Sequence, residues 1–166
     1  MNFYKEEMIL YLTNHPEGFE EAVQLAITDK QPYSWRAAWL LWSCMEENDP
    51  RFKDQIPRIM ACLRDKSDGH QRELLKILYL MEIDEEFEGT LFDHCVSIWE
   101  KIGKKPSVRF NAFKMIVKIS GKYPELSQEI GFLLQDHYLD TLSKGVRHSL
   151  ERMVNGLENI DKGQPK

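Results

Sequence analysis

Basic side chains gather in one segment of the chain. Seven of them, with no acidic residue among them, lie between residues 101 and 122: Lys101, Lys104, Lys105, Arg109, Lys114, Lys118 and Lys122. Lys114, Lys118 and Lys122 are four residues apart, so a helix would carry them on one side. Clustered cations bind phosphate or acidic peptides through charge and hydrogen bonds. A solvated helix face followed by a loop would have the same composition, so the segment alone leaves both interpretations open.

Residue patterns that indicate catalysis or metal binding are missing from the sequence. The histidines, at positions 15, 70, 94, 137 and 148, show no metal-ligand spacing. Asp93, His94 and Cys95 are adjacent, but consecutive helical residues point about 100° apart and cannot converge on one ion. The P-loop, G-x-S-x-G and H-E-x-x-H motifs are also missing. We therefore expect a non-catalytic protein with no metal and no cofactor.

Composition narrows the class of partner and the compartment. The 166 residues carry a net charge of −5, which disfavours a general nucleic-acid coat, because such binding depends on Lys and Arg neutralising phosphates. No stretch approaches the ~18 apolar residues of a membrane span, and the opening MNFYKEEMILYL is not a signal peptide. Three scattered cysteines, Cys44, Cys62 and Cys95, suit a reducing compartment. We expect a cytoplasmic protein without membrane contact.

An arginine recurs at a nearly constant interval, and this repeat predicts the elements that position the residues above. Arg36, Arg72, Arg109 and Arg147 are separated by 36, 37 and 38 residues, and each stands near the start of an apolar, helix-like run. A period in this range is typical of repeat proteins built from helical pairs. We therefore predict an all-α superhelix, or solenoid, of about four helical hairpins after a leading helix over 2–13.

In each predicted pair the first helix is named A and the second, which begins with the arginine, B. The pairs are expected at about 15–48, 49–84, 85–123 and 124–161, within a single domain over 1–161 followed by a disordered tail over 162–166. Prolines 16, 32, 50, 106 and 124 fall between the helices, where a missing N–H is tolerated. Pro57 falls inside the second A helix and is expected to kink it or to delay its start.

The first B helix is apolar on two sides. Trp35, Trp39 and Trp42 fall within an arc of about 60°, and Ala37 and Leu40 lie on the opposite side. A helix that is apolar on two sides is expected to pack on both, as in the inner layer of a stack of helical pairs. We favour core packing for the tryptophans over the alternative, an aromatic binding platform.

With the pairs in place, the chain resembles HEAT-like (armadillo-type) repeat proteins. The match is an arginine opening a B helix, after a tryptophan or a valine in three of the four pairs, with an acid seven residues earlier: Asp29 before Arg36, Asp65 before Arg72 and Asp140 before Arg147. The third pair differs, since Ile102 stands seven residues before Arg109. The resemblance implies that these aspartates and the four arginines form a ladder linking neighbouring repeats, and that the third repeat joins its neighbour differently.

The resemblance also implies that the B helices line the concave side, which we predict to bind a protein segment. Contact residues are expected in the row four and seven positions after the arginines and in the basic stretch: Lys76, Tyr79, Phe113, Lys114 and Lys118. The alternative is a nucleic-acid-directed protein, similar to DNA-repair glycosylases of HEAT type, that uses residues 101–122. An adenylosuccinate lyase is not supported, because its S-S-x-M-P-x-K-x-N loop is missing. We expect a monomer or a weak homodimer.

Overall fold

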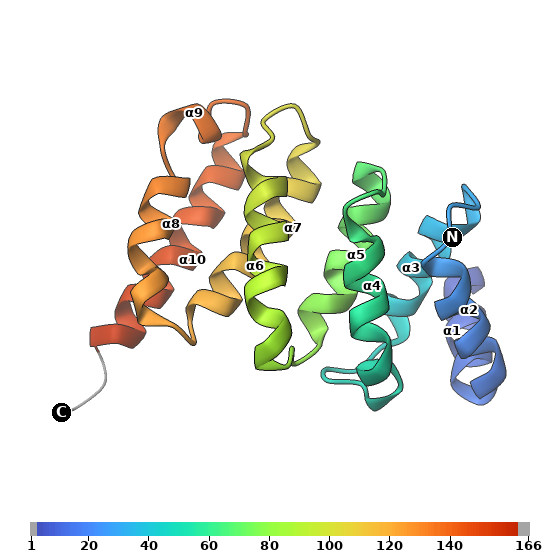
Figure 1. Cartoon of the computed structure of the whole chain (residues 1–166). Coiled ribbons are helices and arrows are strands. Elements are labelled where there is room, and N and C mark those ends of the chain that lie inside the picture. The colour runs from blue at the N-terminus through green and yellow to red at the C-terminus, as the bar shows by residue number, and fades with distance from the viewer. Residues whose placement is uncertain (1–2, 163–166) are drawn as a thin grey trace. The chain divides into compact units, whose positions relative to one another are not determined.

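The computed structural model describes residues 3–162, which form ten α-helices and two 3₁₀ helices joined by turns. Figure 1 traces the labelled α-helices along the chain. The elements are α1 (Phe3–Asn14), α2 (Pro16–Ala26), α3 (Tyr33–Cys44), η1 (Pro50–Gln55), α4 (Ile56–Leu63), α5 (Asp68–Leu80), α6 (Glu85–Glu100), α7 (Pro106–Ser120), η2 (Pro124–Leu126), α8 (Ser127–Leu133), α9 (Asp136–Leu139) and α10 (Lys144–Lys162). The predicted all-α class is therefore confirmed. Helix α10 runs to Lys162, and the rest of the expected tail, 163–166, lies outside the described residues.

The helices fall into two compact units, with the division after Phe87 in the first turn of α6. Unit 1 contains α1 to α5, and unit 2 contains the remainder of α6 together with α7 to α10. The helices occupy the predicted A and B segments, with α3, α5, α7 and α10 as the B helices. The expected single domain over 1–161 stays a prediction, because the structure describes each unit by itself.

Pro57 delays the second A helix, as one of the two sequence-based alternatives predicted. A 3₁₀ helix, η1, occupies the first part of the segment, and α4 begins only at Ile56, so that the proline lies in its first turn. A proline is tolerated there because the first-turn N–H groups have no partner within the helix.

The fourth A helix, expected as one element, is broken into η2, α8 and α9. Gln135 interrupts it with extended backbone, at φ −62° and ψ 148°. The indole of Trp99 donates to the carbonyl of Leu133 at 2.8 Å, and Arg109 donates to the carbonyl of Tyr138 at 2.7 Å. Buried side chains from α6 and α7 thus satisfy the carbonyls at the ends of the short helices, as helix termini require.

Unit 1 is held together by α3, which packs against α1, α2 and α5. Its core includes Phe19 and Phe52, whose rings meet edge to face with centroids 5.1 Å apart. Two buried side chains of the second pair bind the end of α2. Lys66 Nζ donates to the Thr28 carbonyl at 3.1 Å, and His70 Nε2 lies 2.7 Å from the Ala26 carbonyl. A cation and an N–H donor at the C-terminal end of α2 satisfy carbonyls that its own helical turns leave unpaired.

His70 gives this link a pH dependence that can be measured. Its Nδ1 lies 3.0 Å from the Gln31 amide nitrogen, so the neutral ring donates through Nε2 and accepts through Nδ1. Burial lowers the pKa of His70, and the nearby Lys66 lowers it further, against the opposing influence of the Ala26 hydrogen bond and of Asp29. Below about pH 6.5, the ordinary pKa of a histidine in an unfolded chain, the unfolded chain therefore binds more protons than the folded chain. The free energy of unfolding accordingly falls as the pH drops below that value.

We expect the free energy of unfolding of unit 1 to decrease between about pH 7.5 and about pH 5.5, and His70→Gln to reduce that decrease. Urea unfolding at both pH values measures the difference. The exposed His148, which lies in unit 2, is the matched control, and His148→Gln should leave the decrease in unit 1 unchanged. An identical pH dependence in wild type and His70→Gln would contradict this assignment.

Candidate docking groove

An open groove of about 630 Å³ lies in unit 1, between side chains of α1, α2, α3 and α5. The volume falls within the range of about 300 to 1,000 Å³ of ligand-binding pockets. The lining residues are Met8, Ala22, Leu25, Tyr33, Trp35, Arg36, Ala37, Trp39, Leu40 and Arg72. Eight of these ten side chains are apolar or aromatic, so the groove is suited to apolar side chains of a ligand.

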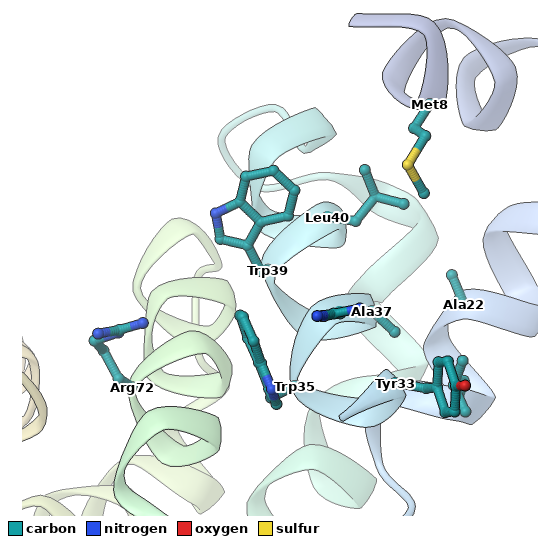
Figure 2. Close-up of a pocket in the computed structure, with 10 residues that line it drawn as sticks. Met8, Ala22, Tyr33, Trp35, Ala37, Trp39, Leu40 and Arg72 are labelled. Carbon is teal, nitrogen blue, oxygen red and sulfur yellow. The ribbon is translucent and has the colours of Figure 1, made fainter. Parts of the chain in front are cut away.

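Tryptophans on α3 form the wall nearest α5. Trp35 and Trp39 are one helical turn apart, and Figure 2 shows both on the side of α3 that faces Arg72, while Leu40 points toward Met8 of α1. Both indoles are half-buried. Tyr33 and Met8 at the margin are 62% and 46% exposed. Large apolar side chains gathered in one accessible hollow are typical of binding surfaces.

Two guanidinium groups accompany this aromatic surface. Arg36 is exposed, and its guanidinium carbon lies 5.7 Å from the centroid of the Trp35 ring, within the range of a cation–π contact. Arg72 is held by its neighbour Glu73, to which it donates from Nε at 2.7 Å and with which its Nη2 forms an ion pair at 2.5 Å. The groove therefore joins an apolar wall to positive charge.

Glu73 is the centre of the polar cluster behind the groove. Its side chain is fully buried, and its carboxylate accepts hydrogen bonds from the Trp42 indole, from Arg72 and from Lys76 Nζ, the last at 3.3 Å. Lys76 Nζ also lies 4.3 Å from the centroid of the Trp42 ring. The cluster joins α3 to α5 and fixes the side chains that neighbour the groove.

The arginine ladder that the resemblance implied is wrong for the first two pairs. Asp29 forms its ion pair with Lys66, at 2.5 Å, and Arg36 points to the groove instead. Within the described residues, Asp65 forms no ion pair with Arg72, whose partner is Glu73. Lys66 bonds both the Thr28 carbonyl and Asp29, so a buried lysine supplies the link expected from Arg36.

In unit 2 one of the expected aspartate–arginine pairs lies close together. Arg147 Nη2 lies 3.8 Å from Asp140 Oδ1, and these two residues are the pair that the seven-residue spacing predicted. Arg109, for which the sequence offered no aspartate, is fully buried and donates to the carbonyls of Trp99 and Tyr138 and to the hydroxyl of Thr141, at 2.8, 2.7 and 2.9 Å. Arg109 thus links the third repeat to the fourth through a carbonyl and a hydroxyl rather than through an aspartate. Burial lowers the pKa of Arg109 from its ordinary value.

Of the predicted contact residues, Lys76 and Tyr79 are half-buried on α5 in unit 1. Lys114 and Lys118 are half-buried on α7 in unit 2. Phe113 was predicted as a contact residue, and this is wrong. Its side chain is fully buried and packs against the Trp99 ring with centroids 4.7 Å apart, because α7 is covered on the side that carries it.

The basic stretch presents less charge than its composition indicates. Arg109 is buried, and Lys122 is ion-paired with the buried Glu88, which also accepts a hydrogen bond from Tyr123 at 2.6 Å. Burial alone would raise the pKa of Glu88, but the hydrogen bonds from Lys122 and Tyr123 outweigh it and hold the pKa below its ordinary value. The nucleic-acid alternative therefore gains no observation in its favour.

Sequence-based reasoning missed the groove although it identified the aromatic stripe. Trp35 and Trp39 were interpreted as core, and the structure leaves both partly accessible beside Arg36. The signal in the sequence is the stripe itself. Ala37, Ala38, Leu40 and Leu41 already supply the buried face of α3, so an additional row of tryptophans exceeds what the core needs.

The other expectations about chemistry concern metals, membranes and cysteines. Within residues that the structure describes, no group of three His, Cys, Asp or Glu side chains could hold a metal ion. None of the described helices is both long and apolar enough to span a bilayer. Burial raises the pKa of the thiols of Cys44, Cys62 and Cys95, which keeps them protonated and poorly nucleophilic.

Comparison with known proteins agrees with the helical pairs. A family model described as a HEAT repeat domain matches residues 4–157. No curated protein and no solved structure matches the chain. The match extends over nearly the whole chain, from α1 into α10, and includes every arginine-led B helix. The chain therefore belongs to the HEAT repeat family.

Proposed function

We propose that this protein is a non-catalytic interaction module that binds a protein segment on its B-helix face, at the groove of unit 1. HEAT repeats generally mediate protein–protein interactions and are typically non-catalytic. The observation that carries the proposal is the pair of half-buried tryptophans, Trp35 and Trp39, in an open apolar hollow. Tryptophans in partly desolvated pockets are the residues that most often dominate binding energy at interfaces.

The groove is built on packed helices, which favours binding without large rearrangement. Helix α3 carries Trp35 and Trp39 on one side and buries Ala38 and Leu41 fully on another. It packs against both α2 and α5, so its backbone is fixed. A preformed surface loses less conformational entropy when a partner binds.

A selection of random peptides displayed on phage, with the full chain as target, tests the proposal. We expect enriched peptides whose affinity falls about 30-fold or more in Trp35→Ala or Trp39→Ala, because truncating an aromatic anchor costs about 2 kcal/mol or more. Circular dichroism establishes that each variant is folded. Phe132 in unit 2, 64% exposed, is the matched control: Phe132→Ala should bind the peptides unchanged.

Two outcomes would overturn the proposal. One is a selection that enriches no peptide above background. The other is enrichment of peptides that bind Trp35→Ala and Trp39→Ala as tightly as wild type, which would place binding elsewhere on the chain.

A further inference from the structure

We infer that the segment bound in this groove is an acidic amphipathic helix. Its apolar side chains would lie against Trp35 and Trp39, and carboxylates on the same helix face would meet Arg36 and Arg72. The inference rests on the proposed function and specifies the chemistry of the partner.

The charge of the groove indicates the sign of the charge on the partner. Among the residues lining the groove are two arginines and no acidic side chain. The carboxylate of Glu73, the neighbour of Arg72 in the chain, is fully buried and already bonded to Trp42, Arg72 and Lys76. Residues 1–87 as a whole carry 10 Lys and Arg against 17 Asp and Glu. The groove is therefore a local positive surface on an acidic unit, complementary to carboxylates.

The guanidinium groups remain able to bind an anion. Arg36 is exposed, and its guanidinium makes a cation–π contact with the Trp35 ring, which uses none of its N–H donors in a hydrogen bond. Arg72 uses Nε and Nη2 toward Glu73, and Nη1 lies outside that ion pair. The bond to Glu73 orients the Arg72 guanidinium, and a fixed planar fork loses less entropy when it binds a carboxylate.

The spacing of the arginines favours a helix over an extended segment. Arg36 and Arg72 hold corresponding places near the starts of α3 and α5, two helices that pack directly on each other. Axes of packed helices lie about 8 to 10 Å apart. In an α-helix, residues i and i+7 share a face and are about 10.5 Å apart, whereas same-face residues of a strand recur about every 6.6 Å. A helix therefore presents carboxylates at an interval close to the spacing of the two helices that carry the arginines.

The same geometry places the apolar anchors. Residues i+3 and i+4 lie between i and i+7 on one helix face. Figure 2 shows Trp35 and Trp39 between the axis of α3 and Arg72, where such side chains would lie. A volume of about 630 Å³ accommodates a few large side chains and not a whole helix, as expected when only the anchors of a helix enter a groove.

A pair of designed peptides tests the inference on the full chain. Each has about 18 residues of Ala and Gln, long enough for appreciable helicity, with Leu at i+3 and i+4. One carries Glu at i and i+7, and the other carries Lys there. Fluorescence anisotropy of a dye on the peptide measures affinity. We expect the Glu peptide to bind roughly tenfold more tightly than the Lys peptide at low salt, and the ratio to shrink as salt is added.

Charge reversal on the protein provides the matched comparison. Arg36→Glu changes an exposed side chain of the groove and should invert the preference, so that the Lys peptide binds more tightly. Arg64→Glu makes the same change at another exposed arginine of unit 1, which does not line the groove, and should preserve the preference for Glu. A Glu peptide with a central proline should bind weakly if the bound form is helical.

The outcomes separate this inference from the proposed function. If both peptides bind equally and both require Trp39, or if the proline peptide binds unimpaired, the acidic helix is wrong and docking at the groove stands. If neither designed peptide binds but selected peptides still require Trp39, the inference of an acidic helix is overturned and the proposed docking at the groove stands. Sedimentation of the chain completes the test. A dimer that dissociates on Trp39→Ala would make a second copy the occupant of the groove and would also overturn it.

Discussion

Replacing Arg109 with alanine is expected to lower the free energy of unfolding of unit 2 by about 3 to 5 kcal/mol. The guanidinium is fully buried, lies 4.6 Å from the centroid of the Trp99 ring, and donates to two carbonyls and one hydroxyl. Alanine would leave the Trp99 and Tyr138 carbonyls without this donor and would open a cavity. Both losses add, because the carbonyls are held in place by α6 and α9.

The chemistry of this site explains why an arginine is needed. No acidic residue stands at position 102, where the spacing in the other pairs would place one. The cation is instead stabilised by carbonyls in the last turns of α6 and α9, where helix dipoles concentrate negative potential. A lysine ammonium is a point charge that cannot span three acceptors with fixed geometry, so Arg109→Lys should also destabilise unit 2, by about 2 kcal/mol.

Urea unfolding, combined with hydrogen exchange read by mass spectrometry, tests this prediction. Amides of residues 88–162 should lose protection in Arg109→Ala, while those of unit 1 should change less. Arg152, exposed on α10, is the matched control, and Arg152→Ala should alter the free energy of unfolding by no more than about 0.5 kcal/mol. A loss below about 1 kcal/mol in Arg109→Ala would show that water replaces the guanidinium at its acceptors.

Most of the fold could be predicted because its signals are local. The arginine interval and the interhelical prolines placed the helical pairs, and α7, expected over 107–121, runs over Pro106–Ser120. The break in the fourth A helix could not be predicted in this way. It accompanies hydrogen bonds from Trp99 and Arg109, which come from α6 and α7 and become neighbours of α8 and α9 only in the folded chain.

The candidate site was less predictable because side chains of equal charge compete for the same partners. The seven-residue interval predicts an ion pair between Asp29 and Arg36. In the folded chain the Asp29 carboxylate instead forms its ion pair with Lys66, which comes from the next pair of helices. Arg72 bonds its immediate neighbour Glu73, a pairing that helical periodicity does not reveal. Ile116 and Tyr79 both stand seven residues after their arginines, yet one is fully buried and the other half-buried. Burial of an equivalent position depends on what packs over it.

Replacing Glu73 is expected to have the largest effect in unit 1. Glu73→Ala should lower the free energy of unfolding by about 3 kcal/mol, because a fully buried carboxylate and its charge-assisted hydrogen bonds are removed. The Trp42 indole N–H would lose its acceptor, and Arg72 and Lys76 would lose their shared anion. Both cations are partly exposed, at 33% and 28% of the side chain, so water compensates part of the loss.

The isosteric variant separates charge from packing. Glu73→Gln keeps the shape and an oxygen that can accept from the Trp42 indole, but it removes the negative charge, so we expect a smaller loss of about 1 to 2 kcal/mol. Urea unfolding followed by tryptophan fluorescence measures both variants, with the exposed Glu82→Ala as the matched control. If Glu73→Gln is as damaging as Glu73→Ala, the carboxylate charge is what joins α3 to α5. If Glu73→Gln is neutral, the ion pairs with Arg72 and Lys76 contribute nothing to stability, and our account of how Arg72 is held beside the groove would be wrong.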